Sequence, residues 1–126
     1  MSEAKTHKAS AIDFLNLIIA NRIDDAYSKH VGANFVHHNP WFRSDADTLR
    51  KGMQDSEHTH PGKFFEIQRA VAEGDLVAVH SRLRFTPEHA GMAVVHIFRF
   101  ENQKIVEFWD IGQMQPDEMV NERGMF

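Results

Sequence analysis

Residues Val94–Gln113 read VVHIFRFENQKIVEFWDIGQ, and this stretch decides the fold class. Apolar and polar residues alternate on both sides of Asn102-Gln103, a pattern typical of two β-strands joined by a tight polar turn. One strand carries His96 and the other Asp110, each among Val, Ile, Phe and Trp. A titratable side chain in an apolar strand is costly unless it is paired, neutral or placed in a pocket. Two such residues on neighbouring strands therefore predict a pocket.

The two strands of this hairpin are each expected to have one mainly apolar face, because strand side chains alternate between faces. The residues that share these faces are Val94, His96, Phe98 and Phe100 on the first strand and Val106, Phe108 and Asp110 on the second. If both faces are concave, His96 and Asp110 look into the same cavity.

Upstream of the hairpin the spacing of apolar residues predicts three helices. Ser10–Asp13 fits a capping box and begins an amphipathic helix. Asp24–Val31 is typical of a second, short helix that ends at Gly32. A similar capping pattern at Ser44–Asp47 opens the third helix. The apolar stripe of the first helix recurs every three or four residues, at Ile12, Leu15, Ile19 and Ile23.

Strand-like patterns fill most of the remaining chain. A short extended segment, Asn34–His38, ends at Asn39-Pro40, and from Lys63 onward the apolar period changes to two. The next strand is predicted to place Phe65, Ile67 and Val71 on one face. We therefore expect an α+β fold in which N-terminal helices pack on one face of a strongly bent, mainly antiparallel sheet. The strands are too few to close a barrel, so an open cone that encloses a pocket is predicted.

Composition limits the class of protein. A chain of 126 residues has room for one domain, which we expect to span residues 1–126. Hydrophobic residues make up 42% and charged residues 25%, which are ordinary globular values. The net charge is −4 and the charges are interspersed, which argues against a nucleic-acid partner. No apolar run approaches membrane-spanning length and the N-terminal segment lacks a signal-peptide pattern, so we expect a cytoplasmic protein with no membrane partner.

Metal and thiol chemistry are disfavoured. The chain has no cysteine, which excludes disulfides, thiol catalysis and zinc sites with Cys ligands. His58 and His60 form a His-Thr-His pattern in a loop predicted over His58–Gly62, but a metal site needs a third ligand and an ordered outer shell. We therefore predict no metal site.

The ordered set of motifs resembles a known family. Together the motifs closely resemble a bacterial family described as SnoaL-like, within the superfamily of nuclear transport factor 2, ketosteroid isomerase, scytalone dehydratase and the polyketide cyclases. The resemblance covers nearly the whole chain from the first helix. The motifs are Phe35–Pro40 (FVHHNP), Gly74–Ser81 (GDLVAVHS), Val95–Phe100 (VHIFRF), Lys104–Asp110 (KIVEFWD) and Asn121–Phe126 (NERGMF).

This resemblance implies a cone-shaped fold with a pocket, and it also shows departures. In ketosteroid isomerase an inward-facing acid precedes a Phe-Arg-Phe-like run, and here His96 takes the similar place. The isomerase's general-base Asp before a Pro is replaced by Asn39, and Tyr27 is the only tyrosine. Steroid isomerisation is therefore disfavoured. SnoaL-like relatives often read His-Trp-Asp on the last strand, where this chain has Phe108-Trp109-Asp110.

The candidate catalytic residues are His96, Asp110 and His38. An imidazole can remove a proton beside a carbonyl near neutral pH, and a carboxylate can orient that imidazole, or act as the base itself if burial raises its pKa. Alternatively, Asp110 binds a backbone N–H or an Arg, and His96 is a satisfied core histidine. His38, just before Asn39-Pro40, is expected at the mouth of the cavity, either assisting catalysis or anchoring its loop.

Six further residues are predicted to bind a substrate, and two others are assigned elsewhere. Trp109 lies opposite Asp110 in the alternation and is expected at a subunit interface, while His80 shares a convex face with Arg82. The predicted substrate-binding residues are Phe35, Asn39, Trp41, Val94, Phe98 and Phe108.

Two kinds of function fit these residues. The first is a cofactor-free acid–base enzyme that acts on a small carbonyl compound, by aldol-type cyclisation, isomerisation or dehydration in a hydrophobic pocket. The second is a non-catalytic module of the same fold that binds a small hydrophobic ligand or only dimerises. In either case the expected partners are a small hydrophobic or carbonyl-containing molecule and a second copy of the chain, bound through the sheet face.

Overall fold

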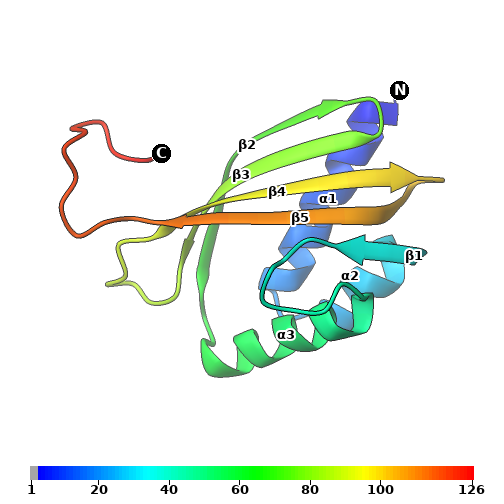
Figure 1. The fold of residues 1–126 in the computed structure, drawn as a ribbon, viewed down its shortest axis with the longest axis horizontal. Coiled ribbons are helices and arrows are strands. Elements are labelled where there is room, and N and C mark those ends of the chain that lie inside the picture. Colours follow the sequence, from blue (N-terminus) through cyan, green and yellow to red (C-terminus); the bar gives the residue numbers. More distant parts are fainter. Residues whose placement is uncertain (1–2) are drawn as a thin grey trace.

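A computed structural model of the chain describes residues 3–126 (Figure 1). Helices come first and strands follow, apart from one early strand, as the sequence pattern predicts. The elements in chain order are α1 (Glu3–Ile19), α2 (Ile23–His30), β1 (Val31–His37), α3 (Ala46–Thr59), β2 (Phe64–Glu73), β3 (Leu76–Arg84), β4 (Met92–Glu101) and β5 (Lys104–Met114).

The strands form one five-stranded sheet in the order β1-β5-β4-β3-β2. Strands β2 to β5 pair antiparallel in sequence order, whereas β1 joins the edge of β5 in parallel. The sheet is not closed into a barrel. The predicted α+β fold with an open, bent sheet is therefore confirmed.

The hairpin β4–β5 is the longest-paired part of the sheet and has the predicted turn. Asn102 and Gln103 both have positive φ, at 50° and 66°, which is the backbone geometry of the two-residue turns that match strand twist. The pairing places His96 directly opposite Asp110 across the two strands. The register of the pairing between β4 and β5 thus sets these two residues side by side.

The hydrophobic core lies between helix α1 and the inner face of the sheet (Figure 1). Phe14 of α1 packs with edge-to-face geometry against Phe98 and Phe108, and all three side chains are almost completely buried. Val77 and Val79 of β3 complete this layer. We call the face of the sheet that carries these residues the inner face, and the opposite face the open face.

Helix α1 begins earlier than the sequence predicts. The capping box at Ser10–Asp13 is wrong as a start signal, since the helix begins at Glu3 and runs through Ser10. The reason is a tertiary contact in its first turns. His7 stacks on Phe100 at 4.4 Å between ring centroids, and its Nδ1 lies 3.1 Å from the carbonyl oxygen of Gly74. Packing of this segment overrides a local capping signal.

The face assigned to Val71 is also wrong. The register of β2 against β3 shifts between Ile67 and Arg69, so the side chains beyond the irregularity change faces. Phe65, Ile67 and Ala70 pack towards the core, whereas Val71 is 65% exposed on the open face. The sequence marks this irregularity only by Arg69, a charged residue at a position where the alternation from Phe65 to Val71 requires an apolar one.

Helix α3 starts close to its predicted capping pattern and ends later than expected. Asp45 is the N-cap, and its carboxylate accepts a hydrogen bond of 2.9 Å from the backbone N–H of Thr48. The helix continues to Thr59, so His58 is helical and not part of a loop. Among residues 3–126, no helix is long and apolar enough to cross a membrane.

Candidate functional site

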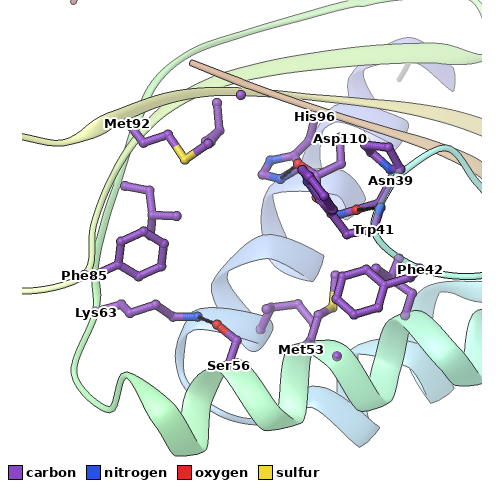
Figure 2. A pocket seen from close by; sticks show the side chains of 17 residues that line it. Asn39, Trp41, Phe42, Met53, Ser56, Lys63, Phe85, Met92, His96 and Asp110 are labelled. Atoms are coloured by element: carbon purple, nitrogen blue, oxygen red, sulfur yellow. Dashed lines mark hydrogen bonds and ion pairs between the residues drawn. The ribbon is translucent and has the colours of Figure 1, made fainter. Parts of the chain in front are cut away.

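A cavity of about 410 Å³ opens between α3, the inner face of the sheet and the loop that follows β1. Figure 2 shows His96 and Asp110 on one wall, Met53 and Ser56 from α3 on the facing wall, and Asn39 and Trp41 at one side. Most lining side chains are apolar. They include Ile18, Phe42, Leu49, Met53, Leu83, Phe85, Met92 and Val94.

His96 and Asp110 form the polar centre of one wall. His96 Nε2 lies 3.3 Å from Asp110 Oδ1, as expected for residues directly opposite each other on paired strands. The side chain of Asp110 is 25% exposed and that of His96 is 12% exposed, so the carboxylate is the more accessible partner. The imidazole stacks on Phe108, with 5.3 Å between ring centroids. Both side chains border the cavity, and their ion pair is with each other. The alternative interpretation, in which Arg or backbone groups bind and bury both residues, therefore does not hold.

Asn39 completes this polar group from the loop after β1. Its Nδ2 donates a hydrogen bond of 2.8 Å to Asp110 Oδ2, and its Oδ1 accepts one of 3.0 Å from the backbone N–H of Trp41. Each oxygen of Asp110 thus has one nitrogen partner, His96 on Oδ1 and Asn39 on Oδ2. Asn39 makes both the Asx-type contact with the backbone and a contact with the candidate acid–base pair.

His37 holds the loop that carries Asn39. Its Nδ1 accepts a hydrogen bond of 3.1 Å from the backbone N–H of Asn39, so its Nε2 is the nitrogen that donates to the carbonyl oxygen of Arg43. The backbone N–H of His37 also donates to Ser44 across the loop at 3.1 Å. These bonds close the segment between β1 and α3 and fix Asn39 beside the sheet.

Two opposing effects act on the pKa of Asp110. Burial alone raises it, but the hydrogen bond from His96, the charge of His96 when protonated and the hydrogen bond from Asn39 together outweigh burial. The net result is a pKa below the usual value of 3.8. Asp110 is therefore a carboxylate throughout the neutral range, so its basic form is always present, but the expected increase in its pKa by burial does not occur.

This lowered pKa predicts a stability difference that depends on pH. A carboxyl group whose pKa is lower in the folded state stabilises the fold above its unfolded pKa, and it loses that contribution as pH falls through the folded value. We expect the unfolding free energy of the wild type to fall relative to that of Asp110→Asn between pH 5 and pH 3. Urea unfolding of both proteins at pH 7, 5 and 3 measures this, and a difference that stays constant would contradict it.

The structure corrects the placement of His38. It lies outside the cavity, on the open face, where its Nε2 is 2.7 Å from Glu107 Oε2 and its ring stacks on Trp109 at 5.1 Å between centroids. Glu107 also contacts Arg99 Nε at 2.9 Å, and the hydrogen bonds from His38 and Arg99 lower the pKa of Glu107. The reason is strand alternation. Phe35 and His37 point inward from β1, so Val36 and His38 point outward.

The predicted substrate-binding residues fall into two groups. Asn39, Trp41 and Val94 line the cavity, and Trp41 is 86% exposed at its mouth. The other three do not line it, because they are buried in the core beneath its floor. These are Phe35, Phe98 and Phe108.

Sequence reasoning missed a buried charged cluster on the far side of the cavity. Lys63 Nζ donates a hydrogen bond of 2.8 Å to Ser56 Oγ and lies 3.0 Å from Glu57 Oε1. The side chains of Lys63 and Glu57 are only 10% and 6% exposed. Lys63 precedes a strand and follows Pro61-Gly62, a context typical of solvated lysines, so no local signal marks it. The only hint is the position of Glu57 on the inward side of α3.

Two glycines in the cavity wall leave space that a neighbouring side chain fills. A Cβ at Gly52 of α3 would lie 2.5 Å from Cε1 of Phe42, and a Cβ at Gly112 of β5 would lie 2.4 Å from Cε of Met92. Both glycines line the cavity. Their lack of a side chain lets Phe42 and Met92 form part of its wall.

The described residues offer no ready cation site. Within residues 3–126, no group of three or more His, Asp or Glu side chains is arranged to hold a metal ion. His58 lies in the last turn of α3, and the ring of His60 instead packs against Phe85, with 4.8 Å between centroids.

Comparison with solved structures shows the same fold in several proteins. AclR, a putative hydroxylase from Streptomyces galilaeus, has a TM-score of 0.74 and 23% identity, with coverage of 90% of this chain and 93% of that one. A LEH-like epoxide hydrolase from M. tuberculosis has a TM-score of 0.69 and 19% identity over 89% and 86% of the two chains. A snoal-like protein from Burkholderia thailandensis has a TM-score of 0.73 and 17% identity over 90% and 98%.

Sequence comparison identifies the family. A search of curated proteins found no significant match. The family model of the SnoaL-like domain matches residues 12–108, which run from α1 to the middle of β5 and include His96. Since this match covers well over half of the sequence, the chain belongs to the SnoaL-like domain family.

Proposed function

We propose that this protein is a cofactor-free acid–base enzyme that acts on a small, largely apolar carbonyl compound, with Asp110 as the proton acceptor. The observation that carries the proposal is an ionised carboxylate, oriented by His96 and Asn39, on the wall of an otherwise apolar cavity. Polar groups that converge in an apolar pocket are the usual mark of a binding or active site.

Asp110, and not His96, is the base in this proposal because of the way the pair is oriented. Asp110 is ionised, so a neutral His96 presents its N–H to the carboxylate through Nε2 and carries its lone pair on Nδ1. His96 Nδ1 is buried and has no hydrogen-bond partner among residues 3–126. The nitrogen that would act as a base is therefore enclosed, whereas the carboxylate is exposed to the cavity.

The proposed step is removal of a proton from the carbon beside a carbonyl group. The C–H bond breaks, its electron pair forms the enolate, and the proton moves to an oxygen of Asp110. The N–H groups of His96 and Asn39 orient the carboxylate for this transfer. Return of the proton to another carbon gives isomerisation, attack of the enolate on a second carbonyl gives aldol-type cyclisation, and loss of a β-hydroxyl gives dehydration. All three need only this acid–base group.

Solvent exchange tests the proposal without knowledge of the natural substrate. We expect the protein to catalyse deuterium incorporation from D₂O at the α-carbon of compact cyclic ketones and 1,3-dicarbonyls, followed by NMR or mass spectrometry. The double variant His96→Ala, Asp110→Asn should show only the spontaneous rate. Equal exchange by wild type and double variant would sink the enzyme proposal and favour a module that only binds a hydrophobic ligand.

We also propose that the protein forms a homodimer through the open face of the sheet. Large apolar side chains are exposed there, namely Val71, Leu76 and Ile111, and no helix within residues 3–126 covers this face. The C-terminal segment reaches part of it, where Phe126 stacks on His80. Trp109 lies on the same face, stacked on His38. An apolar sheet face with a rim of charged residues such as Arg99 and Glu107 is the type of surface that a second copy would cover.

Sedimentation tests whether the protein is a dimer in solution. We expect a dimer at micromolar concentration and a shift towards monomer in Ile111→Asp, because a charge at the centre of the open face would be buried without a partner. Val120→Asp is the matched control, since Val120 is fully exposed in the C-terminal tail and lies outside the sheet. A wild-type protein that sediments as a monomer at these concentrations would overturn the proposal.

A further inference from the structure

The buried cluster of Lys63, Glu57 and Ser56 has no part in the acid–base step, yet it borders the same cavity. Lys63 and Ser56 both line the cavity, and Figure 2 shows them on the side across from His96 and Asp110. Burying an ammonium and a carboxylate together is costly in desolvation and often gains no stability over an apolar pair. The position of these charges at a cavity wall is therefore a reason to ask what they bind.

The hydrogen-bonding capacity of this cluster is not used up within the protein. An ammonium group has three N–H donors, and one of those of Lys63 goes to Ser56 Oγ. The contact with Glu57 Oε1 is an ion pair and not an aligned hydrogen bond, since this buried oxygen receives no hydrogen bond from any residue in 3–126. Ser56 accepts from Lys63, so its own O–H can still donate. Two donor groups, the ammonium of Lys63 and the hydroxyl of Ser56, thus border the same end of the cavity.

The protein charges around the cavity favour a neutral ligand atom over a charged one. Glu57 neutralises Lys63 at 3.0 Å, and Asp110 adds a negative charge on the facing wall. A ligand carboxylate would meet two protein carboxylates and one ammonium, which is unfavourable in a largely apolar cavity. A neutral oxygen, such as that of a ketone or amide, accepts N–H and O–H donors without adding charge.

We propose that Lys63 and Ser56 form a second polar subsite, which binds a neutral carbonyl oxygen at the end of the substrate remote from the reacting carbon. Apolar side chains, including Met53, Leu83 and Phe85, line the space around this subsite. The substrate class is therefore a compact apolar dicarbonyl compound, with one carbonyl activated at Asp110 and the other held by Lys63 and Ser56. This inference rests on the proposed function for the identity of the reacting end.

Binding of a matched pair of ketones tests the subsite. The probes are 2-tetralone and 6-acetyl-2-tetralone, which differ only in a remote carbonyl-bearing group, measured by calorimetry or NMR titration. We expect the wild type to bind the diketone roughly tenfold more tightly, from one to two additional hydrogen bonds. Lys63→Met with Glu57→Gln, which removes the ion pair without leaving a lone charge, should abolish this preference, measured as the ratio of the two affinities. Ser56→Ala, which retains the ion pair, should reduce the preference about threefold.

The outcomes separate this subsite from the proposed reaction. Asp110→Asn should lose exchange activity but keep the preference for the diketone, because the two polar groups act at different ends of the cavity. Equal affinity of the wild type for both ketones, or a preference that survives in both the double variant and Ser56→Ala, would overturn the subsite and leave the exchange reaction standing. Failure of the wild type to bind either ketone would overturn both.

Discussion

Asp110→Asn should lower the rate of catalysed deuterium exchange by roughly 10²- to 10⁴-fold while the protein stays folded, because general-base catalysis contributes about this much. The amide keeps the size of the side chain but cannot accept the proton. Asn39 and His96 would still surround it, so the cavity should keep its shape. The measurement is the exchange rate above the spontaneous background, with circular dichroism as the check on folding.

Two further variants make this result specific. Glu107→Gln removes a carboxylate from the same strand but on the open face, and it should leave exchange unchanged. His96→Gln retains an N–H donor for Asp110 and should cost less than Asp110→Asn. If His96→Gln were the more damaging of the two single changes, the imidazole would be the base, and the assignment of the proton to Asp110 would be wrong.

Lys63→Met alone should destabilise the protein by about 3 kcal/mol, because it leaves the carboxylate of Glu57 buried without its counter-ion. The side chain of Glu57 is only 6% exposed, so water cannot replace the lost ammonium. Urea unfolding at neutral pH gives this difference.

The matched control is Lys51→Met, which breaks an ion pair of the same kind on the exposed side of α3. Lys51 Nζ lies 3.2 Å from Asp55 Oδ2, with 75% and 67% of the two side chains exposed, so the change should cost less than about 1 kcal/mol. Adding Glu57→Gln to Lys63→Met should restore most of the lost stability. Similar losses for Lys63→Met and Lys51→Met would show that burial of the first pair has no energetic consequence.

The sequence allowed prediction of the hairpin, because it follows from the period of two and a short turn. The pairing of His96 with Asp110 also depends on a register shift between Arg99 and Phe100, since a regular hairpin around Asn102-Gln103 would place His96 opposite Trp109. Alternation also predicted that His80 lies away from the core, and its ring is indeed beside Arg69 and Phe126. Where a strand is regular, the alternation of its side chains was sufficient to predict which face of the sheet a residue occupies.

The failures lie where the chain is irregular or where contacts join distant segments. Val71 changed faces at a bulge, which the sequence marks only by the charged Arg69 between Ile67 and Val71. His38 points away from the cavity by alternation with His37, but which face of β1 is turned inward depends on its parallel pairing with the distant strand β5. Lys63 became a cavity residue because α3 places Glu57 and Ser56 beside it. These contacts are set by tertiary packing, and no window of the sequence contains them.

The glycines at positions 52 and 112 give the cavity two points at which its dimensions can change without altering the acid–base group. At Gly112 the obstructing atom is the terminal methyl of Met92, a flexible side chain that can rotate aside to accommodate a methyl group. At Gly52 the obstructing group is the ring of Phe42, whose Cε1 and Cζ would lie 2.5 and 2.6 Å from the new atom, so the mouth loop itself would have to move. The shape of the cavity can therefore be changed most readily at its sheet end, and directed evolution of this scaffold would best begin at position 112.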